Sequence, residues 1–467
     1  MQIPILKGIY AESLTPELRV SYPSNLIPII KENGISDGYL RPAEGIITFG
    51  TGSGQDRGGI NWNGVCYRVQ GTKLVSIASD GTATVLGDVG SGAPVSMDYS
   101  FDRLGIASGG KLYYWNGTTL TQVTDVDLGT VVDFIWVDGY FMSTDGQYLI
   151  VTELNDPLSV NPLKYGSSEI DPDPIVAIKK LRNEVHAVNR YTIEVFDNTG
   201  AANFPFSRIA GGQIQKGAVG TKACCVFADS IAFVGSGRNE SPGVYLAANG
   251  STTKLSTTDI DQKLVALSDA QLSALVVEPR AHKGHQFLYI HLPTETLVFD
   301  AGVSKASNQA IWFTLHSGLL SPSQYRARYF VYAYNKWIVG DTTTNNYGYM
   351  TDDVSSHWGS KISWQFGTQI LYNESKGAIF HALELVALNG RQALGINPQI
   401  STSYSYDGVT WSVDKVKSIG LRGDRLKPIC WHQQGQMRRS RVQRFKGDSD
   451  SYLSFARLEA TLEGLAY

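Results

Sequence analysis

Short apolar runs separated by polar turns recur along most of the chain. Within Gln215–Gly250, the runs Cys224–Ala228, Ile231–Val234 and Val244–Ala248 are followed by an Asn-Gly turn. Runs of this length with such turns are typical of antiparallel strands. One unit of this kind cannot bury its own apolar face, so it needs neighbours like itself.

Seven such units follow one another from Ile46 onward. Each has an apolar residue directly after its turn, and these residues are Leu74, Leu112, Tyr148, Ile193, Val244, Leu297 and Trp337. Their spacings run from 36 to 53 residues, close to the roughly 40–50 residues of a four-stranded propeller blade. The pattern predicts an all-β protein with a β-propeller over residues 46–350. About seven blades are expected, with six or eight as alternatives, and unrelated hairpins in β-sandwiches are the other arrangement.

One stretch of the propeller region has a different period. Between residues 257 and 278 the apolar residues recur at helical spacing, and Ser268 stands where a helix N-cap belongs. We expect a short insert of two helices here, ended by Pro279. Such an insert either covers a hydrophobic patch or provides a docking surface.

Longer alternating strands replace the blade pattern after Asp353. They begin near Ile362, Phe380, Gln399 and Tyr452, and this alternation predicts a C-terminal β-sandwich over residues 355–467.

Residues 1–45 contain five prolines, which exclude a long helix. We therefore expect an extended N-terminal docking arm. Its candidate docking residues are Tyr22, Leu26, Tyr39, Leu40 and Arg41.

Composition narrows the class of protein. Hydrophobic residues make up 42% and charged residues 18%, with a net charge of −3, which excludes a disordered chain and a general polyanion binder. Two of the four cysteines, Cys224 and Cys225, are adjacent, so we expect no disulfide framework and a reducing compartment. We expect no secretion signal and no membrane insertion, because neither apolar pattern is present.

Basic residues are concentrated in one part of the sandwich region. Ten lie between Lys415 and Lys446, where Asp424 is the sole acid. The candidate basic patch consists of Arg422, Arg425, Lys427, Arg438, Arg439, Arg441, Arg444 and Lys446. It predicts contact with DNA phosphates or with an acidic partner, and a solvated face is the alternative.

No group of residues indicates catalysis, a cofactor or a metal. The carboxylates are scattered, so no glycosidase pair can be placed. His282, His285 and His291 have no acidic or cysteine partner near them in sequence. The Gly50–Gly54 stretch lacks the lysine of a phosphate-binding loop, and Ser405–Trp411 reads as a β-turn. We therefore predict a protein that is not an enzyme and has no cofactor.

Several stretches resemble one known family in the same order. Gln215–Gly235 resembles the Gln-Lys-Gly…Phe-Ala-Asp-Ser segment of the tail accessory factors, or packaged-DNA stabilisation proteins, of short-tailed phages. Further similar elements are Gly38–Pro42, Tyr67–Leu74, Val95–Met97 and His285–Asp300. The chain departs from the family at Tyr22–Asn25, where Leu-Pro-Val-Asn is expected.

The resemblance implies a structural role in a virion tail, assembled in the host bacterial cytoplasm. It implies a hexameric tail hub that connects the portal or head-to-tail adaptor to the tail needle and tailspikes. Such a hub helps to retain packaged DNA and forms part of the ejection channel. The alternative function is a propeller glycosidase, a sialidase-like depolymerase or a glycan-binding protein.

Overall fold

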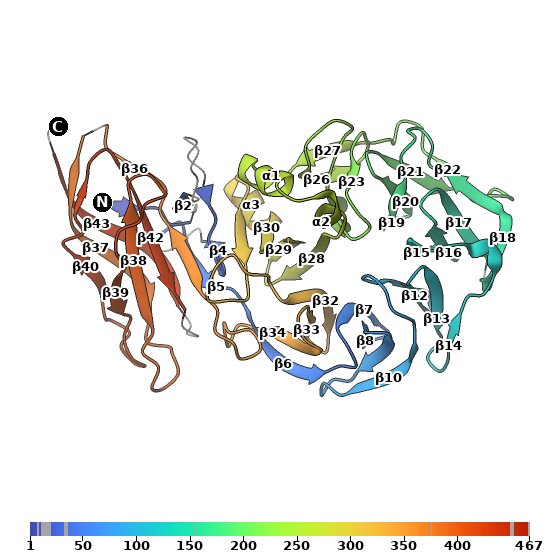
Figure 1. Cartoon of the computed structure of the whole chain (residues 1–467), viewed down its shortest axis with the longest axis horizontal. Helices are drawn as coiled ribbons and strands as arrows, with labels where there is room; N and C mark the ends of the chain where they lie inside the picture. Colours follow the sequence, from blue (N-terminus) through green and yellow to red (C-terminus); the bar gives the residue numbers. More distant parts are fainter. Residues whose placement is uncertain are drawn as a thin grey trace.

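The computed structural model describes residues 1–6, 9–10, 20–31, 36–154, 156–374, 376–448 and 453–465. Two bodies lie side by side, a ring of β-sheets and a β-sandwich (Figure 1). Strands are the main regular element of both bodies and helices are few, which confirms the predicted all-β fold.

The described part of the ring contains seven sheets, each predominantly of antiparallel strands. Blades 1 and 2 comprise β7 (Asp56–Trp62), β8 (Val65–Gln70), β9 (Lys73–Ile77), β10 (Ala83–Asp88), β11 (Ser96–Tyr99), β12 (Leu104–Ser108), β13 (Lys111–Trp115) and β14 (Leu120–Gln122). Blades 3 and 4, with the short 3-10 helix η1 (Val126–Leu128) before them, comprise β15 (Asp133–Val137), β16 (Tyr140–Thr144), β17 (Tyr148–Glu153), β18 (Asp156–Ser167), β19 (Ile175–Leu181), β20 (Glu184–Asn189), β21 (Ile193–Asn198) and β22 (Phe206–Arg208).

Blade 5 contains the stretch that showed the repeat most clearly in the sequence. It comprises β23 (Gly217–Ala218), β24 (Cys224–Phe227), β25 (Ser230–Ser236), β26 (Gly243–Ala248) and β27 (Ser251–Lys254). Blade 6 comprises β28 (Val276–His282), β29 (His285–His291), β30 (Thr296–Asp300) and β31 (Trp312–Leu315). Blade 7 comprises β32 (Ala327–Ala333), β33 (Lys336–Asp341), β34 (Asn346–Thr351) and β6 (Gly45–Thr51).

Strand β6 closes the ring, because it comes from the N-terminal side of blade 1 and pairs with β34. Ile47 is opposite Tyr349 in this pairing. The innermost strands contact one another in the order β7, β11, β15, β19, β24, β28, β32 and again β7. Closure of this kind leaves no blade without a neighbour.

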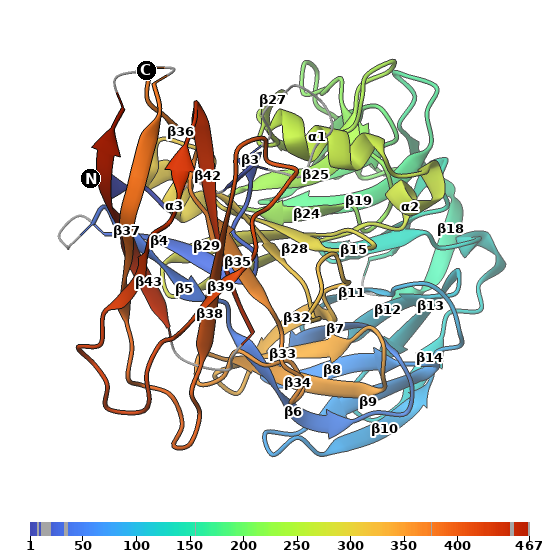
Figure 2. The same ribbon diagram turned by 60° about the vertical axis from the view of Figure 1, so that its left-hand side comes forward.

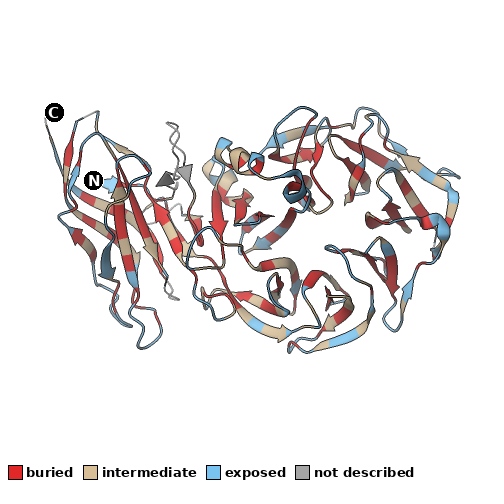
Figure 3. Ribbon diagram, in the orientation of Figure 1, coloured by how far each residue is buried: buried red, intermediate tan, exposed pale blue. Residues whose placement is uncertain are grey.

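Apolar side chains of successive blades pack together and form the core of the ring. Buried residues accordingly recur along the strands of the ring (Figure 3). Among the apolar residues that defined the repeat, Leu74, Leu112, Ile193, Val244 and Leu297 are buried. The spacing in the sequence therefore marked the third strand in six of the blades, whereas Trp337 lies on β33, the second strand of blade 7.

The predicted insert is present as α1 (Thr258–Val265) and α2 (Asp269–Ser273). Ser268 and Gln271 form a reciprocal capping box at the start of α2. Ile260, Leu264 and Leu272 pack in one cluster with residues of blades 5 and 6. Pro279 does not end the insert as predicted, since it lies within β28, an edge strand of its sheet, where proline is tolerated.

A third helix, α3 (Ala301–Ser307), was not predicted. It follows β30 directly, and the Asp300 side chain accepts a hydrogen bond from the Val303 amide at 3.2 Å. Its seven residues are too few to show a helical period. Among the described residues, no helix is long and apolar enough to cross a membrane.

The sandwich consists of two sheets (Figure 2). The first contains β1 (Gln2–Ile3), β4 (Leu26–Ile30), β5 (Gly38–Pro42), β37 (Ala378–Leu388), β40 (Ile429–His432), β41 (Gln436–Met437) and β43 (Ser454–Gly464). The second contains β35 (Trp364–Gly367), β36 (Leu371–Tyr372), β38 (Gln399–Ser405), β39 (Lys415–Ser418) and β42 (Ser440–Gly447). Strands β2 (Ile9–Tyr10) and β3 (Val20–Ser21) pair with each other in a separate two-stranded sheet.

Three strands of the expected N-terminal docking arm form part of the sandwich. Strands β1, β4 and β5 belong to the first sheet of the sandwich, where Leu40 is opposite Phe455. The chain starts in the sandwich, passes through the ring and returns to the sandwich. The expected arm over residues 1–45 also includes positions 7–8, 11–19 and 32–35, which lie outside the described residues.

Candidate functional site

The five candidate docking residues of the arm contact other parts of the same chain. Leu26 and Leu40 are fully buried in the sandwich core. The Tyr22 hydroxyl lies 2.5 Å from the Thr257 hydroxyl, next to α1, and burial raises the pKa of Tyr22 to about 12. Arg41 forms an ion pair with Asp352, at 2.9 Å, and Tyr39 is half-buried opposite Ile29. Tyr22 and Arg41 therefore connect to the ring, whereas Leu26 and Leu40 pack within the sandwich.

Asn25 provides a buried polar connection at this junction. Its amide donates to the carbonyls of Ser363, at 2.7 Å, and His316, at 3.1 Å, and its oxygen accepts from the His316 amide. One side chain thus joins the arm, the end of blade 6 and the entry to the sandwich. The departure from the family pattern at Tyr22–Asn25 falls on this junction.

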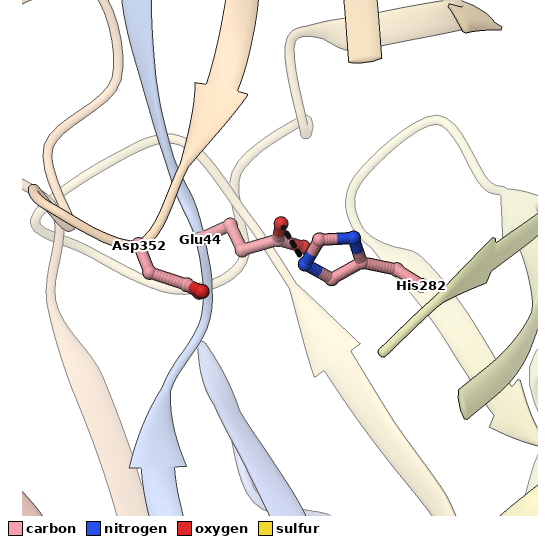
Figure 4. Close-up of side chains that lie close together, drawn as sticks. All are labelled: Glu44, His282 and Asp352. Atoms are coloured by element: carbon pink, nitrogen blue, oxygen red, sulfur yellow. Dashed lines mark ion pairs between the residues drawn. The ribbon is translucent and has the colours of Figure 1, made fainter. Parts of the chain in front are cut away.

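Glu44, His282 and Asp352 come together from three distant parts of the sequence (Figure 4). Their donor types suit a metal ion, but cations of the chain already surround them. Arg280 pairs with Glu44 at 2.5 Å, while Arg41 and Lys283 both pair with Asp352. A divalent cation would be repelled by these groups, so the cluster fits an ion-pair network between the arm, blade 6 and blade 7.

His282 belongs to that network, with its Nε2 3.1 Å from a carboxylate oxygen of Glu44. Burial lowers its pKa, and the neighbouring Glu44 offsets only part of the effect. The other histidines have partners that the sequence did not reveal, because His285 contacts Asp300 at 2.5 Å and His291 contacts Thr296 at 2.9 Å. A turn at Lys283–Gly284 separates His282 from the other two, so the three are not on one strand.

Charged residues on the inner strands connect neighbouring blades. Asp133 of blade 3 pairs with Lys179 of blade 4 at 2.8 Å and accepts from Ser96 of blade 2. Lys222 of blade 5 donates to the same Ser96 hydroxyl at 2.7 Å. Burial lowers the pKa of Lys222 to about 8, and the attraction of Asp133 offsets only part of that effect. Four blades are tied together by this one network near the ring axis.

The carboxylates of blade 4 also have structural partners. Asp173 accepts hydrogen bonds from the amides of Tyr191 and Thr192, and Glu194 pairs with Arg208 at 3.2 Å. A carboxylate held in this way fixes a turn or a neighbouring strand. None of these contacts sets up an acid and base pair among the described residues.

A cleft of about 1020 Å³ separates the helical insert from the sandwich. Trp411 and Arg444 lie on its sandwich side, and the ion pairs Lys263–Glu295 and Lys446–Asp414 lie along its walls. The two ion pairs neutralise most of the charge that faces the cleft.

The eight residues of the candidate basic patch do not form one surface. The Arg441 guanidinium is buried, donates to the Gln434 carbonyl at 2.7 Å and lies over the rings of Phe380 and Tyr404. Arg444 is also buried and lies over the Trp411 ring at 3.7 Å. Lys446 pairs with Asp414 at 3.0 Å. Part of the arginine-rich segment Arg438–Lys446 thus packs inside the sandwich and is not on its surface.

The exposed members of the patch lie at opposite ends of β37. Arg438 and Arg439 follow Met437, which pairs with Ala378 at the start of that strand. Arg422, Arg425 and Lys427 belong to a loop whose Gly423 bonds to Gly390, just beyond the end of the strand. An eleven-residue strand is roughly 35 Å long, so these are two separate groups.

Comparisons with known proteins cover nearly the whole chain. The family described as "Bacteriophage P22 Gp10, beta-propeller" matches residues 1–355, and "Bacteriophage P22 Gp10, beta-sandwich" matches residues 363–463. The tail hub protein gp10 of Salmonella phage P22 is 27% identical over 459 residues, which is 94% of each chain. The similarity thus extends well beyond the stretches recognised in the sequence.

Solved structures match parts of the chain with low scores. The Pan2 WD40 domain of Neurospora crassa is 11% identical, with a TM-score of 0.41 over 64% of this chain and 90% of that one. BamB of Moraxella catarrhalis is 11% identical, with a TM-score of 0.39 over 75% and 97%. Scores this low carry no argument about this protein. The family matches do, and the chain belongs to the bacteriophage P22 Gp10 family as a structural component of a phage tail.

Proposed function

We propose that this protein is the hub of a short phage tail and assembles as a hexameric ring below the portal or head-to-tail adaptor. In this role it carries the tail needle and tailspikes, helps to retain packaged DNA and forms part of the ejection channel. The observation that carries the proposal is the match of both bodies, over 94% of each chain, to a protein named as a tail hub.

The way in which the ring and the sandwich are connected supports a mechanical role in the tail. The ring is closed by β6, and the sandwich is attached through Asn25, Arg41 and the residues around Glu44. Two bodies joined by buried polar contacts transmit force better than two bodies on a flexible linker. Asp173 and Glu194 of blade 4 hold a turn and a neighbouring strand in place, which favours a scaffold over a depolymerase.

Capsids filled with DNA in the absence of this chain provide the test. Adding the purified chain with its tail partners should make the DNA resistant to nuclease and restore infectivity. Capsids that keep their DNA and their infectivity without the chain would exclude the proposed role. A parallel incubation of the chain with host surface polysaccharide should release no sugar, whereas release would favour the enzyme.

Arg438 and Arg439 are the exposed basic residues best suited to face the DNA. They lie next to one another in the turn between β41 and β42, away from the loop of Arg422. Particles with Arg438→Glu and Arg439→Glu should assemble but lose DNA more readily, because the charge reversal removes phosphate contacts. Unchanged DNA content would assign these two residues to another surface.

A further inference from the structure

Two loops form a protrusion with a fixed shape at one end of the sandwich. Residues 388–397 and 418–428 make up this sandwich tip. The Asn389 amide donates to the carbonyls of Ile419, at 3.2 Å, and Lys427, at 2.9 Å, and the Gln392 amide donates to Gly420. Both amide side chains are buried. The loops are therefore held together from inside, and the side chains on their outer surface have defined positions.

The surface of the sandwich tip is both apolar and basic. Leu426 is 96% exposed and Leu394 is 83% exposed. Leu388 and Leu421 are also exposed, and the bases of the tip are Arg391, Arg422, Arg425 and Lys427. The sole acid in these loops is Asp424, which accepts the Leu421 amide at 2.9 Å. Several leucines with such high exposed fractions, lying close together, are typical of an interaction surface.

A second exposed apolar surface lies on the outer side of the ring. It consists of η1 and β18 with their flanking residues, that is 125–128, 153–154 and 156–171, and we name it the acidic face. Val126 is 89% exposed and Leu163 is 75% exposed. The other exposed apolar residues are Leu154, Leu158, Tyr165 and Ile170. Strand β18 is the outermost of blade 3, and its outer edge pairs with no strand in the described part of the chain.

The charge of the acidic face is opposite to that of the sandwich tip. It contains six acids, Asp125, Asp127, Glu153, Asp156, Glu169 and Asp171, and one base, Lys164. Lys164 is neutralised by Glu153 at 2.7 Å, and Asp171 pairs with Arg238 of blade 5 at 3.0 Å. Asp156 and Glu169 have no ion-pair partner among the described residues. Each surface thus offers apolar side chains surrounded by charge of one sign, and the signs are complementary.

The two surfaces belong to opposite ends of the molecule. The sandwich lies at one end of the longest axis and β18 lies at the other (Figures 1 and 2). Complementary surfaces so placed cannot meet within one chain. Between copies they form a heterologous contact, which repeats from copy to copy and gives a ring when the rotation closes.

We propose that the sandwich tip of one copy docks on the acidic face of the next copy. This inference rests on the proposed ring and identifies its interface. The leucines of the tip are buried against the apolar residues of η1 and β18, while the tip bases oppose Asp127, Asp156 and Glu169. Every copy contributes one tip and one face, so each interface in the ring is the same.

Charge exchange provides the test, using the full-length chain. The tip variant carries Arg422→Glu, Arg425→Glu and Lys427→Glu, and the face variant carries Asp127→Lys, Asp156→Lys and Glu169→Lys. Self-association is measured by native mass spectrometry and light scattering over a range of concentrations. Each variant alone should associate about 100-fold more weakly than the wild type, since three opposite-charge contacts become repulsive.

Restoration distinguishes this interface from any other. In an equimolar mixture of the two variants, each reversed tip meets a reversed face, and each original tip meets an original face. The mixture should therefore form alternating rings, and a chain carrying all six changes should form rings by itself. Leu426→Ser should weaken association about tenfold without changing the fold, because this side chain is almost fully exposed.

A matched control carries Lys111→Glu, Lys305→Glu and Lys376→Glu, three exposed lysines outside both surfaces. It should associate like the wild type. Variants of the tip and face that also associate like the wild type would overturn the inference, as would a wild-type chain that stays monomeric. Loss of DNA binding by the tip variant, with association unchanged, would assign the tip to nucleic acid instead. None of these outcomes decides the tail role, which the DNA-filled capsids test separately.

Discussion

Arg441 is a basic residue that we expect to stabilise the fold through contacts within its own chain. Its guanidinium is buried between Phe380 and Tyr404 and bonds to Gln434 and Gln443. Arg441→Ala should lower the free energy of unfolding by about 3 kcal/mol, because it leaves a cavity and unpaired acceptors. Urea denaturation measures the change. Arg439→Ala, at an exposed position in the turn just before β42, should change it by less than about 0.5 kcal/mol. Equal effects of both variants would contradict the burial of Arg441.

Lys222 predicts a pH dependence of stability. Its pKa falls from 10.5 when unfolded to about 8 in the fold, so the unfolded state binds more protons between these values. The contribution of Lys222 to stability therefore rises as the pH increases from about 8 to 10.5. The wild type should gain stability relative to Lys222→Met over this range, as measured by urea unfolding at several pH values. A difference that stays constant with pH would exclude a lysine with a lowered pKa.

Element by element, the parts of the fold that could be predicted are those with local signals. Tight turns and apolar runs marked the blades, and Ser268 marked α2. The helix α3 and the location of Pro279 within β28 were missed, because a seven-residue helix has no visible period and an edge strand tolerates proline. The strand β6 could be recognised as a strand but not as the partner of β34, since 300 residues separate Ile47 from Tyr349.

We expect the short closing strand β6 to contribute strongly to the stability of the ring. Ile46 is buried in the core that joins blades 6 and 7. Ile46→Ala should lower the free energy of unfolding by about 3 kcal/mol, through lost apolar contact and the cavity left behind. Thr48→Ala, at an exposed position of the same strand, should have little effect. Chemical denaturation of both variants measures this, and a neutral Ile46→Ala would mean that β6 does not hold the ring closed.

At the scale of the whole molecule, the sandwich contains strands that lie far apart in the sequence, and this arrangement could not be predicted from local patterns. The arm residues Leu26 and Leu40 are apolar enough to predict docking, but nothing local indicates that they dock on a domain more than 300 residues later. The cluster of Glu44, His282 and Asp352 was missed for the same reason. The sequence also did not reveal that the candidate basic patch is not one surface, because neighbours in sequence such as Arg439 and Arg441 differ in burial: Arg439 is exposed and Arg441 is buried.

Because N-terminal strands belong to the sandwich, we expect that its C-terminal residues cannot fold alone. Its first sheet requires β1, β4 and β5, and its core requires Ile3, Leu26 and Leu40. A fragment of residues 355–467 should therefore lack a cooperative thermal transition, because the apolar side of β43 and β37 is left open to water. Joining residues 1–45 to this fragment through a flexible linker should restore the transition. Circular dichroism during heating distinguishes the two fragments. A sharp transition in the shorter one would show that the N-terminal strands are an addition to a sandwich already complete without them.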